Sequence, residues 1–181
     1  YVAYFQDDWK IGDRLRVNMG VHFNGFSVDE VNYQSLQPRL SARYLLSEKS
    51  SIKWSYVQMA QYMHLLSNQT IGLPTDLWVP VTENIRPQEA WQTALGYAHN
   101  LGEGWELTLE GYYKDMQNLI EYKDGASFLF GFQDWQEKVT SGRGWAYGME
   151  FLLEKKSGRT TGWLGYTLAK TMRQFDEINF G

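Results

Sequence analysis

Strict alternation of apolar and polar residues is the feature that most constrains the fold of this chain. From Leu15 to Asn24 every odd position is apolar and every even position is polar or glycine. Successive side chains of a β-strand point to opposite faces, so this run predicts a strand with one apolar and one polar face. Similar runs predict eight strands, near 1–11, 14–25, 36–46, 51–63, 88–99, 104–117, 143–155 and 160–173. No segment shows convincing helical periodicity, and we therefore expect an all-β chain.

The connections between these strands alternate between short and long. Four are short and rich in turn-forming residues: 11–14, 47–50, 100–104 and 156–159. The three between them are longer: roughly 25–37, 64–87 and 117–143. Short turns of this kind predict hairpins of antiparallel strands. Short turns at one end and long loops at the other are the layout of bacterial outer-membrane barrels, whose short turns are periplasmic.

Strand length and tryptophan positions favour a membrane barrel over a soluble one. Alternation alone fits both, because both place apolar residues on one face. However, the predicted strands exceed the usual five to six residues and match the ~9–11 that cross a bilayer at a tilt. Four tryptophans also lie close to a short turn, where an interfacial aromatic girdle is expected: Trp9, Trp54, Trp105 and Trp163. The sequence thus predicts an antiparallel, up-and-down transmembrane β-barrel segment, although Trp163 is out of phase with its apolar neighbours.

Composition excludes several other classes of protein. The 181 residues are 43% hydrophobic and 16% aromatic, which excludes a disordered chain. No stretch approaches the ~18 consecutive apolar residues of a membrane-spanning helix. The net charge of −4 offers no attraction to nucleic acid, and the absence of cysteine excludes disulfides and thiolate metal sites.

No motif in the sequence predicts catalysis or a bound metal. The three histidines, His22, His64 and His99, are far apart in the sequence, and no pair has metal-ligand spacing. Glu106 and Glu110 share the polar face of one predicted strand about 13 Å apart, and a solvated wall explains them better than a glycosidase pair. We therefore expect no enzyme activity, no cofactor and no metal site.

Several segments, taken in order along the chain, resemble a known family. They are 4–9 (YFQDDW), 38–41 (PRLS), 86–91 (RPQEAW), 109–120 (LEGYYKDMQNLI) and 144–150 (GWAYGME). Together they resemble the barrel of TonB-dependent outer-membrane receptors. Their sequences are most similar to those of receptors from Bacteroidetes-type bacteria. The resemblance spans the whole chain.

The resemblance implies a fold and a function for a larger parent protein. Residues 1–181 would be about eight strands of a barrel of about 22 strands, whose plug domain and C-terminal strands are absent here. The parent would import a scarce nutrient across the bacterial outer membrane with energy from TonB. The implied partners are outer-membrane lipid, the plug domain, TonB through the parent, and a cargo that is an iron chelate, cobalamin or oligosaccharide.

Two sets of residues are candidates for function. Charged residues and one histidine on polar faces are expected to face the barrel lumen: Arg16, His22, Arg39, Arg43, Glu106, Glu110 and Glu150. Aromatic and polar residues of the long connections are candidates for ligand binding: His64, Asp76, Trp78, Tyr122, Phe130 and Trp135. Exposed aromatics beside polar groups suit a sugar, a siderophore or cobalamin, and the alternative is that they pack the loops together.

A second function from another class also fits the alternation. The chain could be a soluble β-sandwich or barrel that acts as a carbohydrate-binding module, with its aromatics stacked on sugars. Such a module would keep its aromatics on one concave face and stay in solution without detergent. A receptor segment would carry an apolar belt and require detergent.

Overall fold

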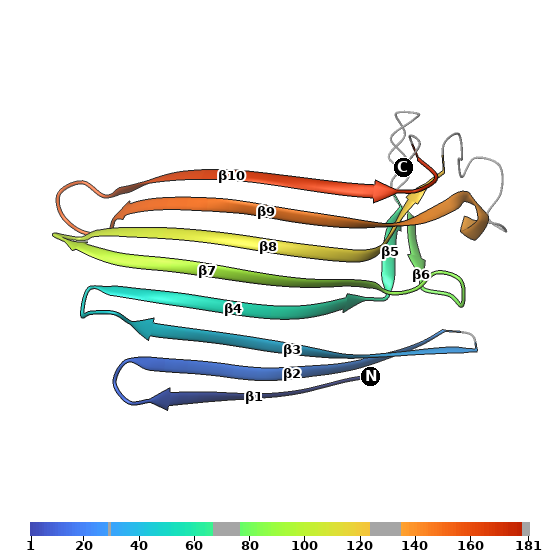
Figure 1. Cartoon of the computed structure of the whole chain (residues 1–181), viewed down its shortest axis with the longest axis horizontal. Helices are drawn as coiled ribbons and strands as arrows, with labels where there is room; N and C mark the ends of the chain where they lie inside the picture. Colours follow the sequence, from blue (N-terminus) through green and yellow to red (C-terminus); the bar gives the residue numbers. More distant parts are fainter. Residues whose placement is uncertain (29, 67–76, 124–134, 179–181) are drawn as a thin grey trace.

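The computed structural model describes residues 1–28, 30–66, 77–123 and 135–178, which form one large sheet and one small sheet (Figure 1). The strands are β1 (Val2–Ile11), β2 (Leu15–Val28), β3 (Val31–Leu45), β4 (Ser50–Gln61), β5 (Met63–Leu66), β6 (Leu77–Pro80), β7 (Gln88–Gly102), β8 (Trp105–Tyr122), β9 (Val139–Lys155) and β10 (Gly162–Phe175). A short 3₁₀ helix, η2 (Trp135–Lys138), precedes β9. Among the described residues, no helix is long and apolar enough to cross a lipid bilayer.

The large sheet has the predicted up-and-down topology. Its eight strands are ordered β1-β2-β3-β4-β7-β8-β9-β10, and all neighbours are antiparallel. This order follows the sequence except where β5 and β6 form a separate two-stranded sheet. Among the described residues no second sheet of similar size covers either face, so the architecture is not the β-sandwich of the soluble alternative. The eight strands confirm the predicted barrel segment.

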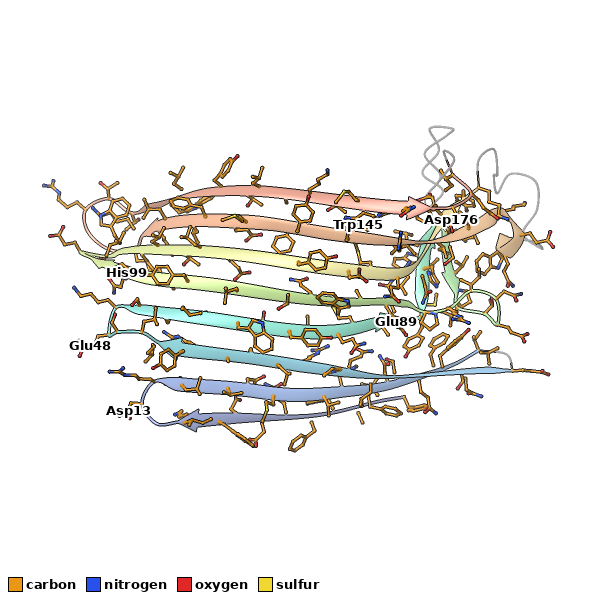
Figure 2. The ribbon with its side chains drawn as sticks, in the orientation of Figure 1. Asp13, Glu48, Glu89, His99, Trp145 and Asp176 are labelled. Carbon is orange, nitrogen blue, oxygen red and sulfur yellow. The ribbon has the colours of Figure 1, made fainter. Side chains whose placement is uncertain are left out.

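The short turns and the long connections lie at opposite ends of the sheet (Figure 1). All four short turns lie at one end, which we call the turn end, and three of them use glycines with positive φ, such as Gly12 (62°) and Gly158 (114°). The opposite end, which we call the loop end, carries β5, β6 and η2. Figure 2 shows Asp13, Glu48 and His99 toward the turn end, and Asp176 at the loop end.

The strands are longer at the loop end than the sequence predicted. The pairing of β2 with β3 continues from Leu15–Tyr44 to Val28–Val31, so most of the predicted loop 25–37 is strand. Similarly, β8 and β9 pair as far as Tyr122 and Val139, which shortens the predicted loop 117–143. Backbone hydrogen bonds can extend a hairpin whatever side chains it carries, whereas alternation marks only the part with one apolar face.

A small hydrophobic core lies at the loop end instead of between two sheets. The predicted strand 51–63 ends at Gln61, and the chain turns into β5, which pairs with β6 through His64–Val79 and its neighbours. The buried residues of this loop core are Leu66, Val79, Ile85, Ile120, Tyr122 and Val139, with Leu77 and Trp135 packed against them. The loop core therefore joins the segment around 64–87 to the extended ends of β8 and β9.

The cross-strand register gives the large sheet one apolar face. Residues directly opposite each other on neighbouring strands point the same way. One register row across all eight strands is Ile11, Leu15, Tyr44, Ile52, Tyr97, Leu109, Phe151 and Tyr166. Side chains on this face are exposed to solvent in the isolated chain: Leu95 is 59% exposed and Met149 is 66% exposed. An apolar face of this size on a single sheet requires an apolar environment or a partner.

Candidate functional site

The polar face of the sheet carries a row of charged residues at a single register. Directly opposite one another, from β1 to β10, lie Lys10, Arg16, Arg43, Lys53, Gly96, Glu110, Glu150 and Thr167. We call this the charged row. Its four cations occupy adjacent strands β1 to β4, and its two carboxylates occupy β8 and β9. The row lies near the turn end, since Arg16 follows the β1–β2 turn by two positions.

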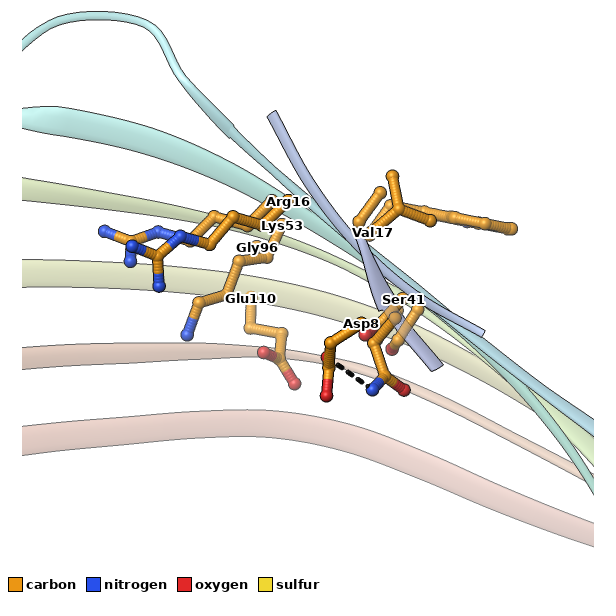
Figure 3. Close-up of a pocket in the computed structure, with 13 residues that line it drawn as sticks. Asp8, Arg16, Val17, Ser41, Lys53, Gly96 and Glu110 are labelled. Carbon is orange, nitrogen blue, oxygen red and sulfur yellow. Dashed lines mark hydrogen bonds between the residues drawn. The ribbon is translucent and has the colours of Figure 1, made fainter. Parts of the chain in front are cut away.

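A shallow depression of about 290 Å³ borders the middle of this row. Small side chains such as Ser41, Ser55 and Ala94 line it, together with four charged residues of the row: Arg16, Arg43, Lys53 and Glu110. Figure 3 shows Arg16, Lys53 and Glu110 extending on one side of the sheet while Val17 extends on the other. Asp8 also lines the depression and accepts a hydrogen bond from Asn18 Nδ2 at 2.7 Å.

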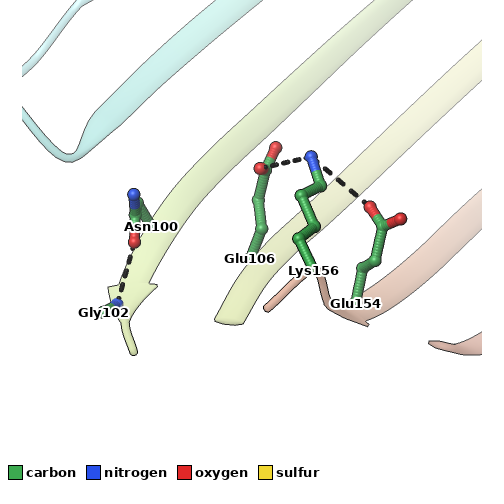
Figure 4. Close-up of polar contacts among 5 residues, drawn as sticks. All are labelled: Asn100, Gly102, Glu106, Glu154 and Lys156. Carbon is green, nitrogen blue, oxygen red and sulfur yellow. Dashed lines mark hydrogen bonds and ion pairs between the residues drawn. The ribbon is translucent and has the colours of Figure 1, made fainter. Parts of the chain in front are cut away.

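The row's cations form no ion pair with any residue that the structure describes. Closer to the turn end, two carboxylates that face each other are both bound by one lysine (Figure 4). Glu106 lies directly opposite Glu154, and Lys156 Nζ lies 2.7 Å from Glu106 Oε2 and 3.4 Å from Glu154 Oε2. The hydrogen bond to Glu106, with the charge of Glu154, raises the pKa of Lys156. This triad thus supplies its own counterion, whereas the charged row does not.

The register places all seven residues predicted to face the lumen on this one polar face: Arg16, His22, Arg39, Arg43, Glu106, Glu110 and Glu150. Arg39 lies two positions along β3 from Ser41, toward the loop end, and pairs with Gly20 and Val57. His22 pairs with Tyr4 and Gln37, and its Nδ1 is buried without a hydrogen-bond partner among the described residues.

His64, predicted as a ligand-binding residue, is fully buried in the structure. Its Nδ1 accepts a hydrogen bond from Gln88 Nε2 at 3.0 Å, so its Nε2 carries the proton and donates to the carbonyl oxygen of Arg86 at 3.1 Å. Burial lowers the pKa of His64, against the smaller opposing effect of the Arg86 carbonyl. Both ring nitrogens are therefore occupied, and the geometry gives His64 a structural role at the loop end.

Two further ligand-binding candidates also belong to the loop core. Tyr122 is 9% exposed, and burial, followed by the charge of Glu121, raises its pKa to about 12. Trp135 packs against the same cluster. These positions fit the alternative in which aromatics hold the loops together. Asp76 and Phe130 lie outside the described residues.

Trp78 is the candidate that the structure leaves exposed, at 58%. Alternation along the small sheet turns His64, Leu66 and Val79 inward, and leaves Leu65 and its direct partner Trp78 outward. Met63, 37% exposed, lies on the same outward side. We call this side the outer face of β5–β6. It presents an apolar surface at the loop end.

Sequence reasoning missed several residues that organise these sites. Gln88, which fixes the orientation of His64, carries no recognisable signal in the sequence. Thr82 and Gln136 meet through a 2.8 Å hydrogen bond from Thr82 Oγ1 to Gln136 Oε1, across 54 positions of sequence. The alignment of Lys10 with the other cations of the charged row likewise depends on pairing between strands. No group of three or more acidic or histidine side chains in the described part of the chain could hold a metal ion.

Comparison with known proteins places these features in a family. The family model described as TonB dependent receptor-like, beta-barrel matches residues 1–180. No curated protein matches the chain. A solved structure, the FrpB iron transporter from Neisseria meningitidis (F3-3 variant), superimposes with a TM-score of 0.69 at 13% sequence identity. The match covers 98% of this chain and 26% of that chain, so the likeness concerns the fold alone and about a quarter of a longer protein.

Proposed function

The chain belongs to the TonB-dependent receptor-like β-barrel family, and on this premise we propose that it forms wall and extracellular loops of a nutrient-import receptor. The family is one of outer-membrane receptors and transporters and not of enzymes. The match over residues 1–180, together with the eight-stranded up-and-down sheet, carries the proposal. The parent protein would also contain a plug domain and would receive energy from TonB.

The proposed cargo is an iron chelate, cobalamin or an oligosaccharide. An iron chelate is the first to test, because the solved structure with the similar fold is described as an iron transporter. The decisive experiment is uptake by cells that express the parent receptor, with labelled iron chelate, cobalamin and oligosaccharide supplied in turn. Uptake of any one that depends on both the receptor and TonB supports import. Receptor-independent uptake of all three contradicts it.

We propose that the apolar face meets lipid and the polar face meets the lumen. The register supports this, because Arg16, Arg43 and Lys53 share one face while Val17 and Leu109 lie on the other. A cation on the lipid side near the membrane centre costs roughly 2–4 kcal/mol, so a charged row is tolerated only on the lumen side.

The loop end would be extracellular and the turn end periplasmic, as in other outer-membrane barrels. Single cysteines at Glu83, near β6, and at Glu48, in the β3–β4 turn, test this orientation. The chain has no cysteine of its own, so each would be the only reporter within this segment. On intact cells a membrane-impermeant maleimide should label Glu83→Cys and not Glu48→Cys. The reverse pattern would show that the topology is inverted.

The outer face of β5–β6 is the proposed surface for cargo capture, with Trp78 at its centre. Rigid aromatic side chains commonly dominate such contacts, and losing one weakens binding by about tenfold or more. Trp78→Ala in the parent receptor should therefore reduce cargo affinity while leaving barrel assembly intact. Trp163→Ala is the matched control, since Trp163 is 76% exposed but lies near the turn end. If Trp78→Ala binds cargo normally, the connection 64–87 is a lid and the cargo is held elsewhere.

A further inference from the structure

Lys170 is a cation on the apolar face of the sheet. It lies four positions after Tyr166 on β10, and its direct partner on β9 is Tyr147. Arg143 and Lys155 share this face but occupy its loop end and its turn end, whereas Lys170 lies between them. If this face meets lipid, as proposed, a cation away from both ends is costly unless an anion lies beside it.

No described residue neutralises Lys170. Its ammonium group forms no ion pair and no cation–π contact within the described part of the chain. The nearest described carboxylate on the same face is Asp115, which lies two strands away on β8 and one residue pair nearer the loop end. The two strands are about 10 Å apart, and Asp115 accepts a hydrogen bond from Gln117 Nε2 at 3.4 Å instead. The counterion of Lys170 must therefore come from outside the described residues.

A hollow of about 930 Å³ adjoins Lys170 on the apolar face. It exists because Gly111 on β8 has no side chain to fill the space between its direct partners, Leu95 and Met149. A Cβ atom at Gly111 would meet only the Gly148 oxygen, at 3.9 Å, so the space over this glycine is open. Most of the lining is apolar or aromatic and comes from five strands: Trp54, Leu95, Tyr113, Tyr147, Met149 and Leu168. The hollow can therefore hold an apolar chain.

A second hydrogen-bond donor stands beside Lys170 at the edge of the hollow. Tyr147, its direct partner, is 43% exposed, and its hydroxyl has no hydrogen-bond partner among the described residues. The Tyr147 hydroxyl and the Lys170 ammonium group can both donate to the oxygens of one phosphate. Trp145 follows two positions along β9 toward the loop end (Figure 2), and tryptophan is typical of the level of lipid headgroups.

We propose that the hollow binds an anionic lipid, with an acyl chain over Gly111 and the phosphate of the headgroup on Lys170 and Tyr147. The proposal rests on the proposed function, which places this face in the membrane. An anionic lipid matches both properties of the site, because a free phosphate would leave the hollow unfilled and a neutral lipid would leave Lys170 without a counterion. Tyr147 lies much closer to Trp145 than to Lys155 along β9, so the lipid belongs to the leaflet at the loop end.

Photocrosslinking of the full-length receptor in lipid nanodiscs tests the proposal. The probes are phosphatidylglycerol, which is anionic, and phosphatidylcholine, which has no net charge, each with the same diazirine-bearing acyl chain. Each probe is supplied at the same low fraction in phosphatidylcholine nanodiscs, and peptide mapping locates the attached lipid after illumination. One cation near an anionic lipid favours its binding by about fivefold. Phosphatidylglycerol should therefore label the peptides that contain Leu95, Gly111 and Met149 about fivefold more than phosphatidylcholine does.

Three variants separate the role of the charge from that of the hollow. Lys170→Gln should abolish the preference for phosphatidylglycerol, because an acyl chain still fits but the cation is gone. Gly111→Leu should reduce labelling of the hollow by both lipids, because its side chain fills the space. Lys155→Gln is the matched control, since it removes a cation from the turn end of the same face, where Lys155 Nζ lies 5.1 Å from the centre of the Trp105 ring. The preference should remain in this control.

Equal labelling of the hollow by the two lipids in the unmodified receptor would overturn the proposal, because Lys170 would then have its counterion in another part of the parent. A preference that survives Lys170→Gln, or that Lys155→Gln removes equally, would also overturn it. If Lys170→Gln does not assemble, the comparison of the two lipids in the unmodified receptor still decides. Failure of the proposed function gives a different pattern, in which neither lipid labels any peptide of the apolar face.

Discussion

His64 is held neutral by the loop core, and this makes the loop end sensitive to acid. Burial lowers its pKa below the ordinary value of 6.5, so the unfolded segment binds a proton more readily than the folded one. The stabilisation is therefore complete above about pH 6.5 and is lost as the pH falls through the lowered pKa. We expect amides of β5 and β6 in the parent receptor to lose protection against hydrogen exchange between pH 7 and pH 5, after correction for intrinsic rates.

The control for this effect removes the titrating group. His64→Gln should make the protection of β5 and β6 almost independent of pH, because glutamine does not titrate in this range. His99→Gln, which removes a histidine far from the loop core, should retain the dependence. Equal pH dependence in the His64→Gln variant would mean that another group controls the opening of the loop end.

At the scale of strands, β9 and β10 approach each other too closely for a side chain at Gly148. A Cβ atom there would lie 2.9 Å from the carbonyl oxygen of Leu168 and 2.9 Å from the ring of Tyr112. Gly148→Ala should therefore destabilise the barrel by about 1–3 kcal/mol. Gly111→Ala on β8 is the matched control, because its Cβ would meet only the Gly148 oxygen, at 3.9 Å. The urea midpoints of the two receptors in detergent measure the difference, and equal midpoints would contradict it.

Substitutions at neighbouring positions of β8 test the assignment of the two faces of the sheet. Leu109 lies on the apolar face and Glu110 on the polar face of β8. If the apolar face meets lipid, as proposed, a cation at Leu109 would cost roughly 2–4 kcal/mol near the membrane centre, whereas a cation at Glu110 would face the lumen. Leu109→Arg should thus reduce the amount of assembled receptor in the outer membrane far more than Glu110→Arg. Equal tolerance of the two substitutions would show that the faces are assigned the wrong way round.

At the scale of the whole molecule, the described residues form one large sheet, and none of its other described elements covers either face of it. Leu95, Met149 and Tyr166 on the apolar face are all more than half exposed. The outer edges of β1 and β10 carry no further strand among the described residues, and open edges of this kind promote association. We expect residues 1–181, expressed alone, to sediment as aggregates without detergent. A monodisperse chain in plain buffer by analytical ultracentrifugation would argue against a lipid-facing belt.

The sequence by itself determined the class of fold, the eight principal strands and the identity of their two faces. These are local properties, because alternation with a period of two dictates which side of a strand each residue occupies. The runs around Val17 and Leu109 illustrate this, since the structure places both residues on the face that their alternation predicts. Turn-forming residues in the four short connections likewise located the hairpins without information from elsewhere in the chain.

Only the tertiary structure decided the register between strands and the packing of the loops. The alignment of Lys10 with Lys53 depends on hydrogen bonds between backbones, which are the same for every residue type and leave no trace in a single sequence. The same holds for the bulge at Asn118, whose φ of 55° interrupts the pairing of β8 with β9 and whose side chain donates to the Pro87 carbonyl. The burial of His64 and the packing of Trp135 against the loop core depend on contacts between distant segments, which a single sequence does not reveal.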